Sequence, residues 1–319
     1  TGSATIIIAL DAIGDIESAR SIQLEINKTR LAEPEGPKLL GLTPKWEESA
    51  ELDTTVFDIK ISMIDENGEI MEFTKSTSPI KITIPYKLKE GEDPELITVL
   101  YLADDGSIKN MAGIYDTGAG TVSFETNFSG KYTIKELNVN FADTKCHWAK
   151  RPIEVMASKG VIHGITGDIY EPNQFITRAE FAKLIATVMK IVDDGAAADF
   201  PDISEQAWYY KYVASAAKAG IINGRPDGSF APDETITRQD VAVMAINALK
   251  IGAIEDVDKY LAFEDVNETS SYAKEAVAIA VKYGIISGKP NNIMDPKGNA
   301  TRGEAAVIIY RLFNLKEIM

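Results

Sequence analysis

Cysteine and histidine are nearly missing from this chain of 319 residues. Cys146 is its single cysteine, and His147 and His163 are its two histidines. One cysteine cannot form a disulfide within the chain, and so few thiols and imidazoles argue against a metal centre. No nucleophile motif adjoins either histidine, and no pair among the 48 acidic residues stands out as catalytic. We therefore expect no catalytic residue, no cofactor and no metal.

Long hydrophobic runs are missing as well. No segment approaches the roughly 20 apolar residues that a membrane-spanning helix needs, and no basic-then-apolar leader opens the sequence. We expect no membrane insertion, and we expect any export signal to lie before Thr1. The net charge is −15, with 24 acidic and 13 basic residues in positions 1–140 and 24 and 20 in the remainder. This balance disfavours general attraction to nucleic acid.

What the sequence does contain is an internal repeat. Residues 160–164, 220–224 and 284–288 read GVIHG, GIING and GIISG, at steps of 60 and 64 residues. An arginine follows 18 residues after the first glycine of each copy: Arg178, Arg238 and Arg302. A period near 60 predicts three tandem copies of one supersecondary unit.

Each copy is predicted to form a helix, a loop and a second helix. Apolar residues with helical spacing precede each glycine: Ile153, Met156, Ala157; Val213, Ala216, Ala217; Val277, Ala280, Val281. A second set follows each arginine: Phe181, Leu184, Ile185, Val188; Val241, Met244, Ala245, Ala248; Ala305, Ile308, Ile309, Leu312. The glycine after the first set suits a left-handed helix end. Since two short helices cannot bury such faces alone, we expect the copies to pack into one body.

The first 140 residues have a period of two instead. Strands are predicted at residues 56–64, 70–73, 81–86, 96–102, 121–126 and 130–134, with a hairpin turn at 65–68 and a long loop at 33–44. Pro85 is expected at a strand end or edge. Many short strands separated by turns predict an antiparallel β-sandwich. The chain is therefore predicted to be α+β and multidomain.

Acidic turns in this region raise the question of calcium. Asp104, Asp105 and Asp116 offer oxygen ligands, but no loop has the ligand spacing of a calcium cage. We interpret these residues as ordinary β-turns.

The arginines begin helices and are flanked by capping residues. A threonine precedes each arginine and an acid follows it two places on: Thr177 and Glu180, Thr237 and Asp240, Thr301 and Glu304. These pairs predict capping boxes, although the side chain of Asp240 is one methylene shorter than that of the two glutamates, which makes its reach less certain. Capping gives the threonines and acids a structural role.

An arginine at the positive end of a helix is less expected. A cation there costs roughly 0.3–1 kcal/mol, so three such placements indicate either an anionic ligand or an ion pair between repeats. Free helix-start amides beside a guanidinium favour a carboxylate or phosphate. We favour the ligand interpretation and expect Arg238→Ala to weaken binding with little effect on the melting temperature.

An aromatic residue lies 12 residues before each repeat glycine: Trp148, Trp208 and Tyr272. Aromatic faces hold sugar rings, and they also fill the cores of small units. We list these residues with the ligand-binding candidates, although burial in the core is the favoured role.

The complete pattern resembles a triplet of S-layer homology domains over residues 141–313. It comprises an opening phenylalanine and aspartate, the aromatic residue, the glycine element, a proline (Pro172, Pro232, Pro296) and the Thr-Arg-x-acid helix start. The resemblance implies a pseudo-threefold helical bundle of secreted proteins from Gram-positive-type bacteria. In that family the bundle binds a secondary cell-wall polymer through pyruvylated N-acetylmannosamine, in grooves between motifs.

Carried onto this sequence, the resemblance makes the arginines and the groove glycines Gly164, Gly224 and Gly288 ligand-binding residues. We expect unequal grooves, because the first motif has Ile165-Thr166 where the others have a basic residue and proline, and the third has Tyr272 for tryptophan. The second groove follows the pattern most closely. The rival interpretation is a protein-protein assembly module of a surface lattice.

The domain boundaries follow from the repeats. We expect a β-sandwich spacer or interaction domain at residues 1–137, and repeats at 138–195, 196–257 and 258–319. Residues 124–132 also resemble the closing strands of ZU5-like sandwiches of bacterial surface proteins. We expect a monomeric, extracellular, surface-attached module whose partner is a polysaccharide.

Overall fold

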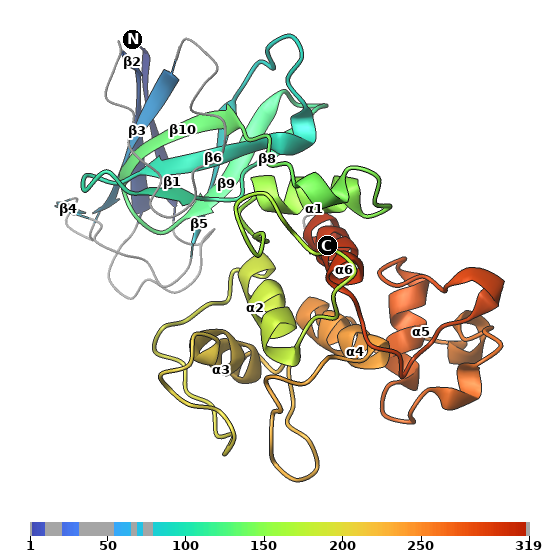
Figure 1. The fold of residues 1–319 in the computed structure, drawn as a ribbon. Helices are drawn as coiled ribbons and strands as arrows, with labels where there is room; N and C mark the ends of the chain where they lie inside the picture. The colour runs from blue at the N-terminus through green and yellow to red at the C-terminus, as the bar shows by residue number, and fades with distance from the viewer. Residues whose placement is uncertain (1, 10–20, 32–53, 65–68, 73–78, 317–319) are drawn as a thin grey trace. The chain divides into compact units, whose positions relative to one another are not determined.

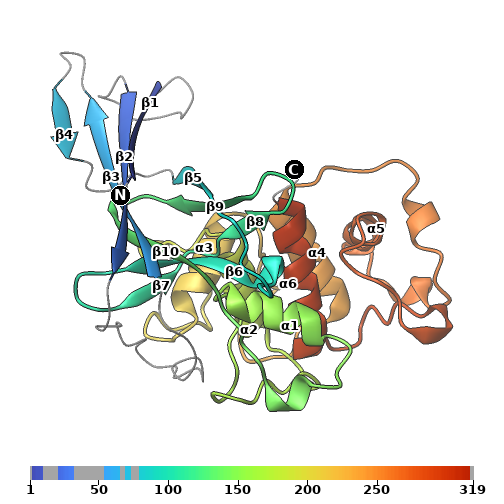
Figure 2. The same ribbon diagram turned by 90° about the horizontal axis from the view of Figure 1, so that it is seen from above.

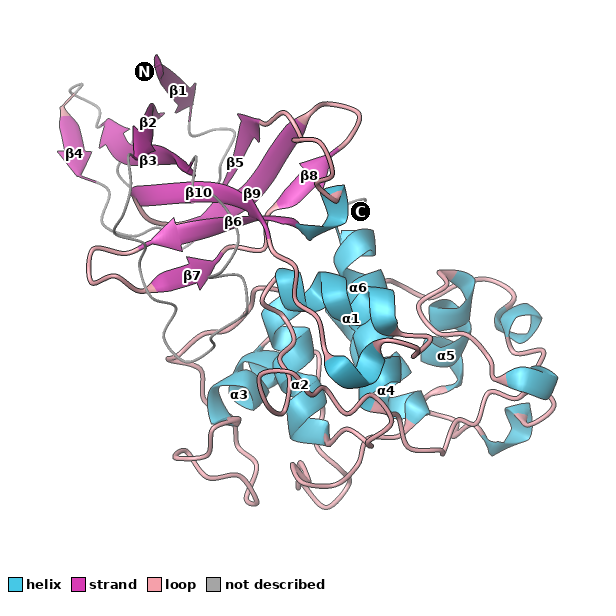
Figure 3. Ribbon diagram, turned by 45° about the horizontal axis from the view of Figure 1, so that its top comes forward, coloured by secondary structure: helices cyan, strands magenta, loops and turns pink. Residues whose placement is uncertain are grey.

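The computed structural model describes residues 2–9, 21–31, 54–64, 69–72 and 79–316. It divides into two compact units (Figure 1). The first consists of Thr1–Val139 with Ala157–Gly160, and the second of Asn140–Met156 with Val161–Met319. Strands make up the first unit and helices the second (Figure 3).

The first unit consists of two antiparallel sheets. The larger has the strand order β1-β2-β3-β10-β6-β7, with β4 also paired to β3, and the smaller has the order β5-β9-β8. Their bounds are β1 Gly2–Ala9, β2 Ser21–Leu31, β3 Thr54–Ile64, β4 Ile70–Glu72, β5 Ile80–Pro85, β6 Ile97–Leu102, β7 Ile108–Asn110, β8 Ile114–Asp116, β9 Thr121–Thr126 and β10 Gly130–Glu136. The predicted strands are confirmed. β1, β2, β7 and β8 were not predicted.

The period of two places alternate residues in one core. In β3, Phe57, Ile59 and Ile61 are buried whereas Asp58 and Lys60 are exposed. Buried residues of both sheets belong to the same hydrophobic cluster, among them Ile82 of β5 and Val99 of β6. Pro85 is the last residue of β5, an edge strand, as predicted.

Hydrogen bonds within each acidic turn involve its own aspartate. Asp105 accepts a hydrogen bond from the amide of Ser107, and Asp116 accepts from the amides of Gly118 and Ala119. These contacts confirm ordinary turns. The predicted hairpin turn at 65–68 and the loop at 33–44 lie outside the described residues, although β3 and β4 pair antiparallel as the hairpin requires.

Each motif of the second unit contains two helices. The leading helices are α1 Lys150–Ser158, α3 Tyr210–Lys218 and α5 Lys274–Lys282, and the trailing helices are α2 Arg178–Val188, α4 Arg238–Leu249 and α6 Arg302–Lys316. Gly160, Gly220 and Gly284 follow the leading helices with φ of +71°, +71° and +67°. The left-handed helix ends are therefore confirmed.

The predicted apolar faces are the buried faces. Every residue predicted for the trailing helices is at most 9% exposed, and seven of the nine predicted for the leading helices are buried. The two others, Ala217 and Val281, are half-buried. The three trailing helices all contact one another, and α4 and α6 run side by side in Figure 2.

Backbone hydrogen bonds join the three motifs in a closed ring just before the trailing helices. The amide of Ile176 donates to the carbonyl of Ala300, that of Ala300 to Ile236, and that of Ile236 back to Ile176. The N–O distances are 3.0, 2.9 and 3.0 Å. Each motif therefore supplies one short segment, and the three segments hydrogen-bond to one another.

Candidate functional site

The capping boxes at the three trailing helices differ as the sequence predicts. In α2 and α6, the threonine hydroxyl accepts from the third amide and the glutamate accepts from the threonine amide (Thr177 and Glu180; Thr301 and Glu304). In α4 the amide of Asp240 donates to the Thr237 hydroxyl, but the shorter Asp240 carboxylate accepts from that hydroxyl at 2.8 Å instead. The shorter Asp240 side chain therefore does not complete the capping box.

The prediction of free helix-start amides is wrong. The first amide of each trailing helix donates to a loop carbonyl of another motif: Arg178 to Glu234, Arg238 to Gly298, and Arg302 to Gln174. The second amide donates to the carbonyl of a motif proline in the same loop: Ala179 to Pro232, Gln239 to Pro296, and Gly303 to Pro172. With the threonine cap on the third amide, the described structure leaves no helix-start amide for an anion at these three helices.

The three arginines connect neighbouring motifs and are buried. They are 7%, 6% and 8% exposed, in chain order. Each Nε donates to a carbonyl of another motif: Arg178 to Phe230, Arg238 to Met294, and Arg302 to Tyr170, at 2.8–2.9 Å. Each Nη1 faces a capping acid of the same neighbour: Asp240 at 3.7 Å, Glu304 at 2.6 Å and Glu180 at 3.9 Å. The ion pair between repeats is therefore present.

Burying a charged guanidinium costs free energy, and these contacts offset that cost. Desolvation lowers the pKa of Arg178, and the charge of Asp240 opposes that shift. The guanidinium carbons of Arg178 and Arg302 also lie 5.0 and 4.6 Å from the ring centroids of Phe230 and Tyr170. A planar cation hydrogen-bonded at its edge and covered by a ring on its face is held in one orientation.

An aspartate positions the loop that receives each arginine. Asp143 accepts from the amides of residues 170 and 171, Asp202 from those of 230 and 231, and Asp265 from those of 294 and 295. The second residue of each pair has positive φ: Glu171, Ala231 and Asp295. The carboxylate thus stabilises a backbone bend that L-residues seldom adopt.

The groove glycines are required for close packing. A Cβ on Gly164, Gly224 or Gly288 would lie 2.7–2.8 Å from a ring carbon of the phenylalanine that opens the same motif: Phe141, Phe200 or Phe263. None of these glycines has positive φ. Contact with the phenylalanine ring therefore explains the glycine without any ligand.

The predicted core role of the three aromatics is wrong. Trp148, Trp208 and Tyr272 are 65%, 56% and 62% exposed. The core positions are filled instead by Tyr170, Phe230 and Met294, which are at most 2% exposed. A residue 12 places before the glycine lies near the start of the leading helix, where its ring projects from the unit.

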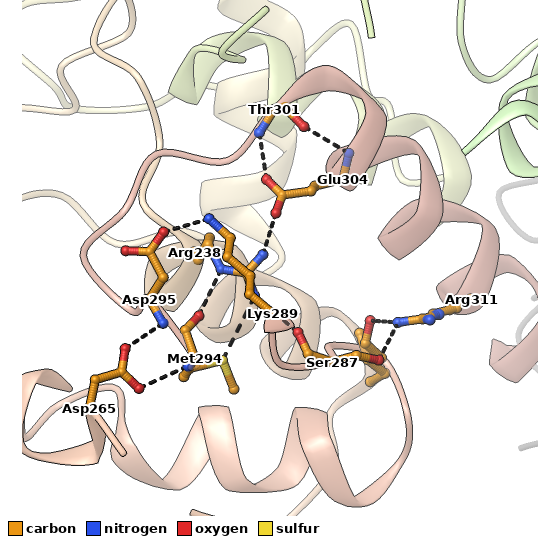
Figure 4. A network of polar contacts seen from close by, with 10 residues as sticks. Arg238, Asp265, Ser287, Lys289, Met294, Asp295, Thr301, Glu304 and Arg311 are labelled. Carbon is orange, nitrogen blue, oxygen red and sulfur yellow. Dashed lines mark hydrogen bonds and ion pairs between the residues drawn. The ribbon is translucent and has the colours of Figure 1, made fainter. Parts of the chain in front are cut away.

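Arg238 lines a cleft of about 370 Å³. Its other lining residues include Trp148, Gly288, Lys289, Glu304 and Arg311; together with Arg238 we call these the Arg238 cleft. Figure 4 shows Arg238 between Glu304, Met294 and Ser287, whose carbonyl accepts from Nη2 at 3.0 Å. Lys289 pairs with Asp295, and Arg311 donates to the Ser287 hydroxyl at 3.3 Å.

Arg302 lines a second cleft of about 250 Å³. We define the Arg302 cleft by Arg302, His163, Gly164, Glu180, Lys183 and Trp208. The carbonyl of His163 accepts from Arg302 Nη2 at 3.2 Å, and the Lys183 ammonium lies 5.7 Å from a Trp208 ring centroid. Desolvation, followed by the charge of Lys183, lowers the pKa of the His163 imidazole.

Each cleft combines side chains from all three motifs, which the sequence interpretation did not foresee. Arg238 of the second motif meets Gly288 of the third and Trp148 of the first. Arg302 of the third motif meets Gly164 of the first and Trp208 of the second. The resemblance placed the grooves between motifs but did not assign one residue from each motif to the same cleft, and the preference for the second groove stays a prediction.

Sequence reasoning missed two groups of residues at this site. Tyr170, Phe230 and Met294 stand ten residues after the first repeat glycine, and the two aromatics at this shared offset were the available signal. Lys183 and Arg311 have no basic counterpart in the other motifs, so no periodic signal marks them.

Over residues 2–9, 21–31, 54–64, 69–72 and 79–316, no group of three or more His, Cys, Asp or Glu side chains is arranged to hold a metal ion. Within the same part of the chain, no helix is both long and apolar enough to cross a membrane.

Comparison with known proteins identifies the repeated motif. The family model of the S-layer homology domain matches three times, at residues 140–182, 199–242 and 262–306. The chain therefore belongs to the proteins that carry S-layer homology domains, and its second half is a triplet of them.

Similar proteins carry different names. The chain is 36% identical over 263 residues to an amylopullulanase of Thermoanaerobacterium thermosulfurigenes, covering 81% of this chain and 14% of that protein. It is 40% identical over 178 residues to exoglucanase XynX of Acetivibrio thermocellus, covering 55% of this chain and 16% of that protein. It is 32% identical over 166 residues to an S-layer protein of Bacillus thuringiensis subsp. finitimus, covering 52% of this chain and 20% of that protein. The chain spans a fifth or less of these relatives. The amylopullulanase match is long enough to include part of the first unit.

Proposed function

We propose that the three motifs form a non-catalytic module that attaches the protein containing them to the cell wall, by binding a secondary cell-wall polysaccharide. Relatives named as an amylopullulanase, an exoglucanase and an S-layer protein share this segment, although it is a fifth or less of each. A segment common to proteins with such different names suits attachment at the cell surface better than catalysis.

The motifs are arranged about a pseudo-threefold axis in this proposal. The cyclic hydrogen bonds among Ile176, Ala300 and Ile236 support it, as do the three arginines that each reach the neighbouring motif. Three equivalent positions for a ligand follow from such an arrangement.

The ligand is a pyruvylated sugar that carries a carboxylate. The observation that carries this proposal is the pairing of an exposed tryptophan with a guanidinium in each cleft: Trp148 with Arg238, and Trp208 with Arg302. Arg302 has five N–H donors, and its two backbone hydrogen bonds occupy two of them, which leaves donors for a carboxylate. The tryptophan face suits the apolar face of a sugar ring.

The first unit is a β-sandwich spacer in this proposal, spanning residues 1–137, followed by motifs at 138–195, 196–257 and 258–319. Its two antiparallel sheets share one core, which supports a unit that folds around its own interior. The module works as a monomer outside the cell.

A lattice-assembly module remains the second candidate. Similarity to S-layer proteins favours it. The clefts argue against it, because an exposed tryptophan beside a guanidinium in a small cleft suits a sugar ring better than the surface of a neighbouring subunit.

Sedimentation with purified cell walls tests the proposal. Walls are prepared in two forms, untreated and with the pyruvate removed by mild acid, and each is incubated with the chain. We expect binding to untreated walls and its loss after pyruvate removal. Equal sedimentation with both forms would contradict the pyruvylated ligand, and assembly of the chain without walls would favour the lattice.

A further inference from the structure

The third arginine, Arg178, has a different environment from the other two. By equivalence with the two clefts, its partners are Asp240, Gly224 and the aromatic Tyr272. Tyr272 is the one member of its set that is not tryptophan. Its hydroxyl donates to Asp240 Oδ1 at 2.7 Å and accepts from the Gln239 side-chain amide at 3.1 Å.

Gln239 makes this contact possible. The equivalent residues in the other motifs are Ala179 and Gly303, which have no side-chain donor. The Gln239 amide also donates to the Ser270 hydroxyl at 3.1 Å, and its oxygen accepts from the Ser270 backbone amide at 3.0 Å. Gln239 is 5% exposed, so the contact with Tyr272 is made from a fixed side chain.

Both carboxylate oxygens of the acid that faces Arg178 already accept a hydrogen bond. Asp240 accepts from Tyr272 on one oxygen and from the Thr237 hydroxyl on the other. A tryptophan at position 272 could not reproduce this, because an indole N–H donates but cannot accept from Gln239. Tyrosine and glutamine therefore act as a pair that joins the aromatic residue to the capping acid.

Charge is balanced at this position but not in the two clefts. Arg178 and its neighbour Arg225 face Asp240 and Glu234, and Arg225 pairs with Glu234. Among the described residues that line the Arg302 cleft, Arg302 and Lys183 face one acid, Glu180. In the Arg238 cleft, three cations (Arg238, Lys289, Arg311) face Glu304 and the Asp295 that pairs with Lys289. Each cleft therefore has one excess positive charge for an anionic ligand.

From these observations, and resting on the proposed function, we infer that the chain binds two acidic sugars and not three. The Arg238 and Arg302 clefts are the sites, and the Tyr272–Gln239–Asp240 cluster closes the Arg178 position. A ligand there must displace hydrogen bonds that the protein already makes, two of them to a charged carboxylate. Their loss corresponds to an affinity roughly a hundredfold weaker than in the open clefts.

Calorimetric titration of the whole chain with the methyl glycoside of pyruvylated N-acetylmannosamine tests the inference by counting sites. We expect two equivalents per chain. Trp148→Ala and Trp208→Ala should each reduce the number to one, whereas Tyr272→Ala should leave it at two or more.

Restoring the common pattern should create the third site. We expect Tyr272→Trp combined with Gln239→Ala to raise the count from two to three, with the melting temperature measured alongside. Should that variant fold poorly, Tyr272→Phe removes only an exposed hydroxyl and should add a weak third site.

The outcomes separate the inference from the proposed function. Three equivalent sites in the unaltered chain, or a site lost with Tyr272→Ala, would overturn the inference and leave wall binding intact. A single site, or a double variant that folds and still binds two, would overturn it too. No binding by any variant would remove the proposed function, and the inference with it.

Discussion

Among single residues, the repeated arginine stabilises the contact between motifs as well as lining a cleft. Arg238 donates to two carbonyls, those of Met294 and Ser287, and pairs with Glu304. These contacts argue against the expectation that its removal has little effect on the melting temperature. A side chain 6% exposed with three partners leaves buried polar groups unpaired when it is removed.

We predict that Arg238→Ala lowers the free energy of unfolding by about 3 kcal/mol. Denaturant unfolding of the helical unit measures this. Arg225→Ala is the matched control, because it removes an ion pair whose two side chains are 37% and 60% exposed and should shift the midpoint little. If both variants unfold at the same denaturant concentration, the burial of Arg238 contributes no additional stability.

Tryptophan separates binding from folding better than arginine does. Trp148 is 65% exposed and lines the Arg238 cleft. We predict that Trp148→Ala removes the Arg238 site and thereby weakens binding to untreated walls at least about tenfold, since two linked sites bind with greater avidity than one. Its melting temperature should not change. Tyr283→Ala, at 38% exposure and outside both clefts, serves as the control and should bind as the unaltered chain does.

At the scale of elements, the turn after each leading helix is held by a glycine against a phenylalanine. A Cβ on Gly164 would collide with the Thr166 carbonyl oxygen and lie 2.7 Å from the Phe141 ring. We predict that Gly164→Ala lowers the unfolding free energy by about 1–3 kcal/mol. Gly252→Ala, where nothing lies within 4 Å of the added carbon, should be neutral in the same assay. Equal stability of both would mean that the turn relaxes around the methyl group.

Asp202, which precedes the second leading helix, makes its loop sensitive to acid. At Asp202, burial raises the pKa, but the hydrogen bonds from the amides of Phe230 and Ala231 outweigh it and lower the pKa below its usual value. A lowered pKa contributes stability above the unfolded-state value near 4, and that contribution is lost as pH falls through the folded-state value.

We therefore predict that Asp202→Asn lowers the melting temperature at pH 7 and that the difference from the unaltered chain shrinks below about pH 4. Melting curves from pH 7 to pH 2.5 measure it. A difference that stays constant over this range would show that the charge of Asp202 is irrelevant to the loop.

For the whole molecule, the closed ring of hydrogen bonds sets the triplet apart from an open repeat array. In an open array each repeat contacts only its neighbours in sequence, and losing the last one leaves the others intact. Here the third motif contacts both others through α6 and through the bonds of Ala300. We predict that a chain ending at residue 257 loses most of its helical circular dichroism and its cooperative melting. Retention of about two thirds of the signal with a sharp transition would contradict this.

The sequence predicted features that depend on local spacing and missed contacts between residues that are far apart in the chain. Helical spacing correctly predicted the buried face of every trailing helix. The capping pairs indicated that the shorter side chain of Asp240 could differ from the two glutamates in its contacts. Spacing along the chain could not show that Trp148 meets Arg238 of another motif. Nor could it show that the helix-start amides are used, because the carbonyls of Glu234, Gly298 and Gln174 come from loops of other motifs.

A crystal structure of the chain with bound pyruvylated N-acetylmannosamine would show where the acidic sugar binds. We expect the sugar in the Arg238 and Arg302 clefts, with its ring on Trp148 and Trp208 and its carboxylate about 3 Å from each guanidinium. A sugar bound outside both clefts, or a carboxylate turned to solvent away from the arginines, would contradict this expectation.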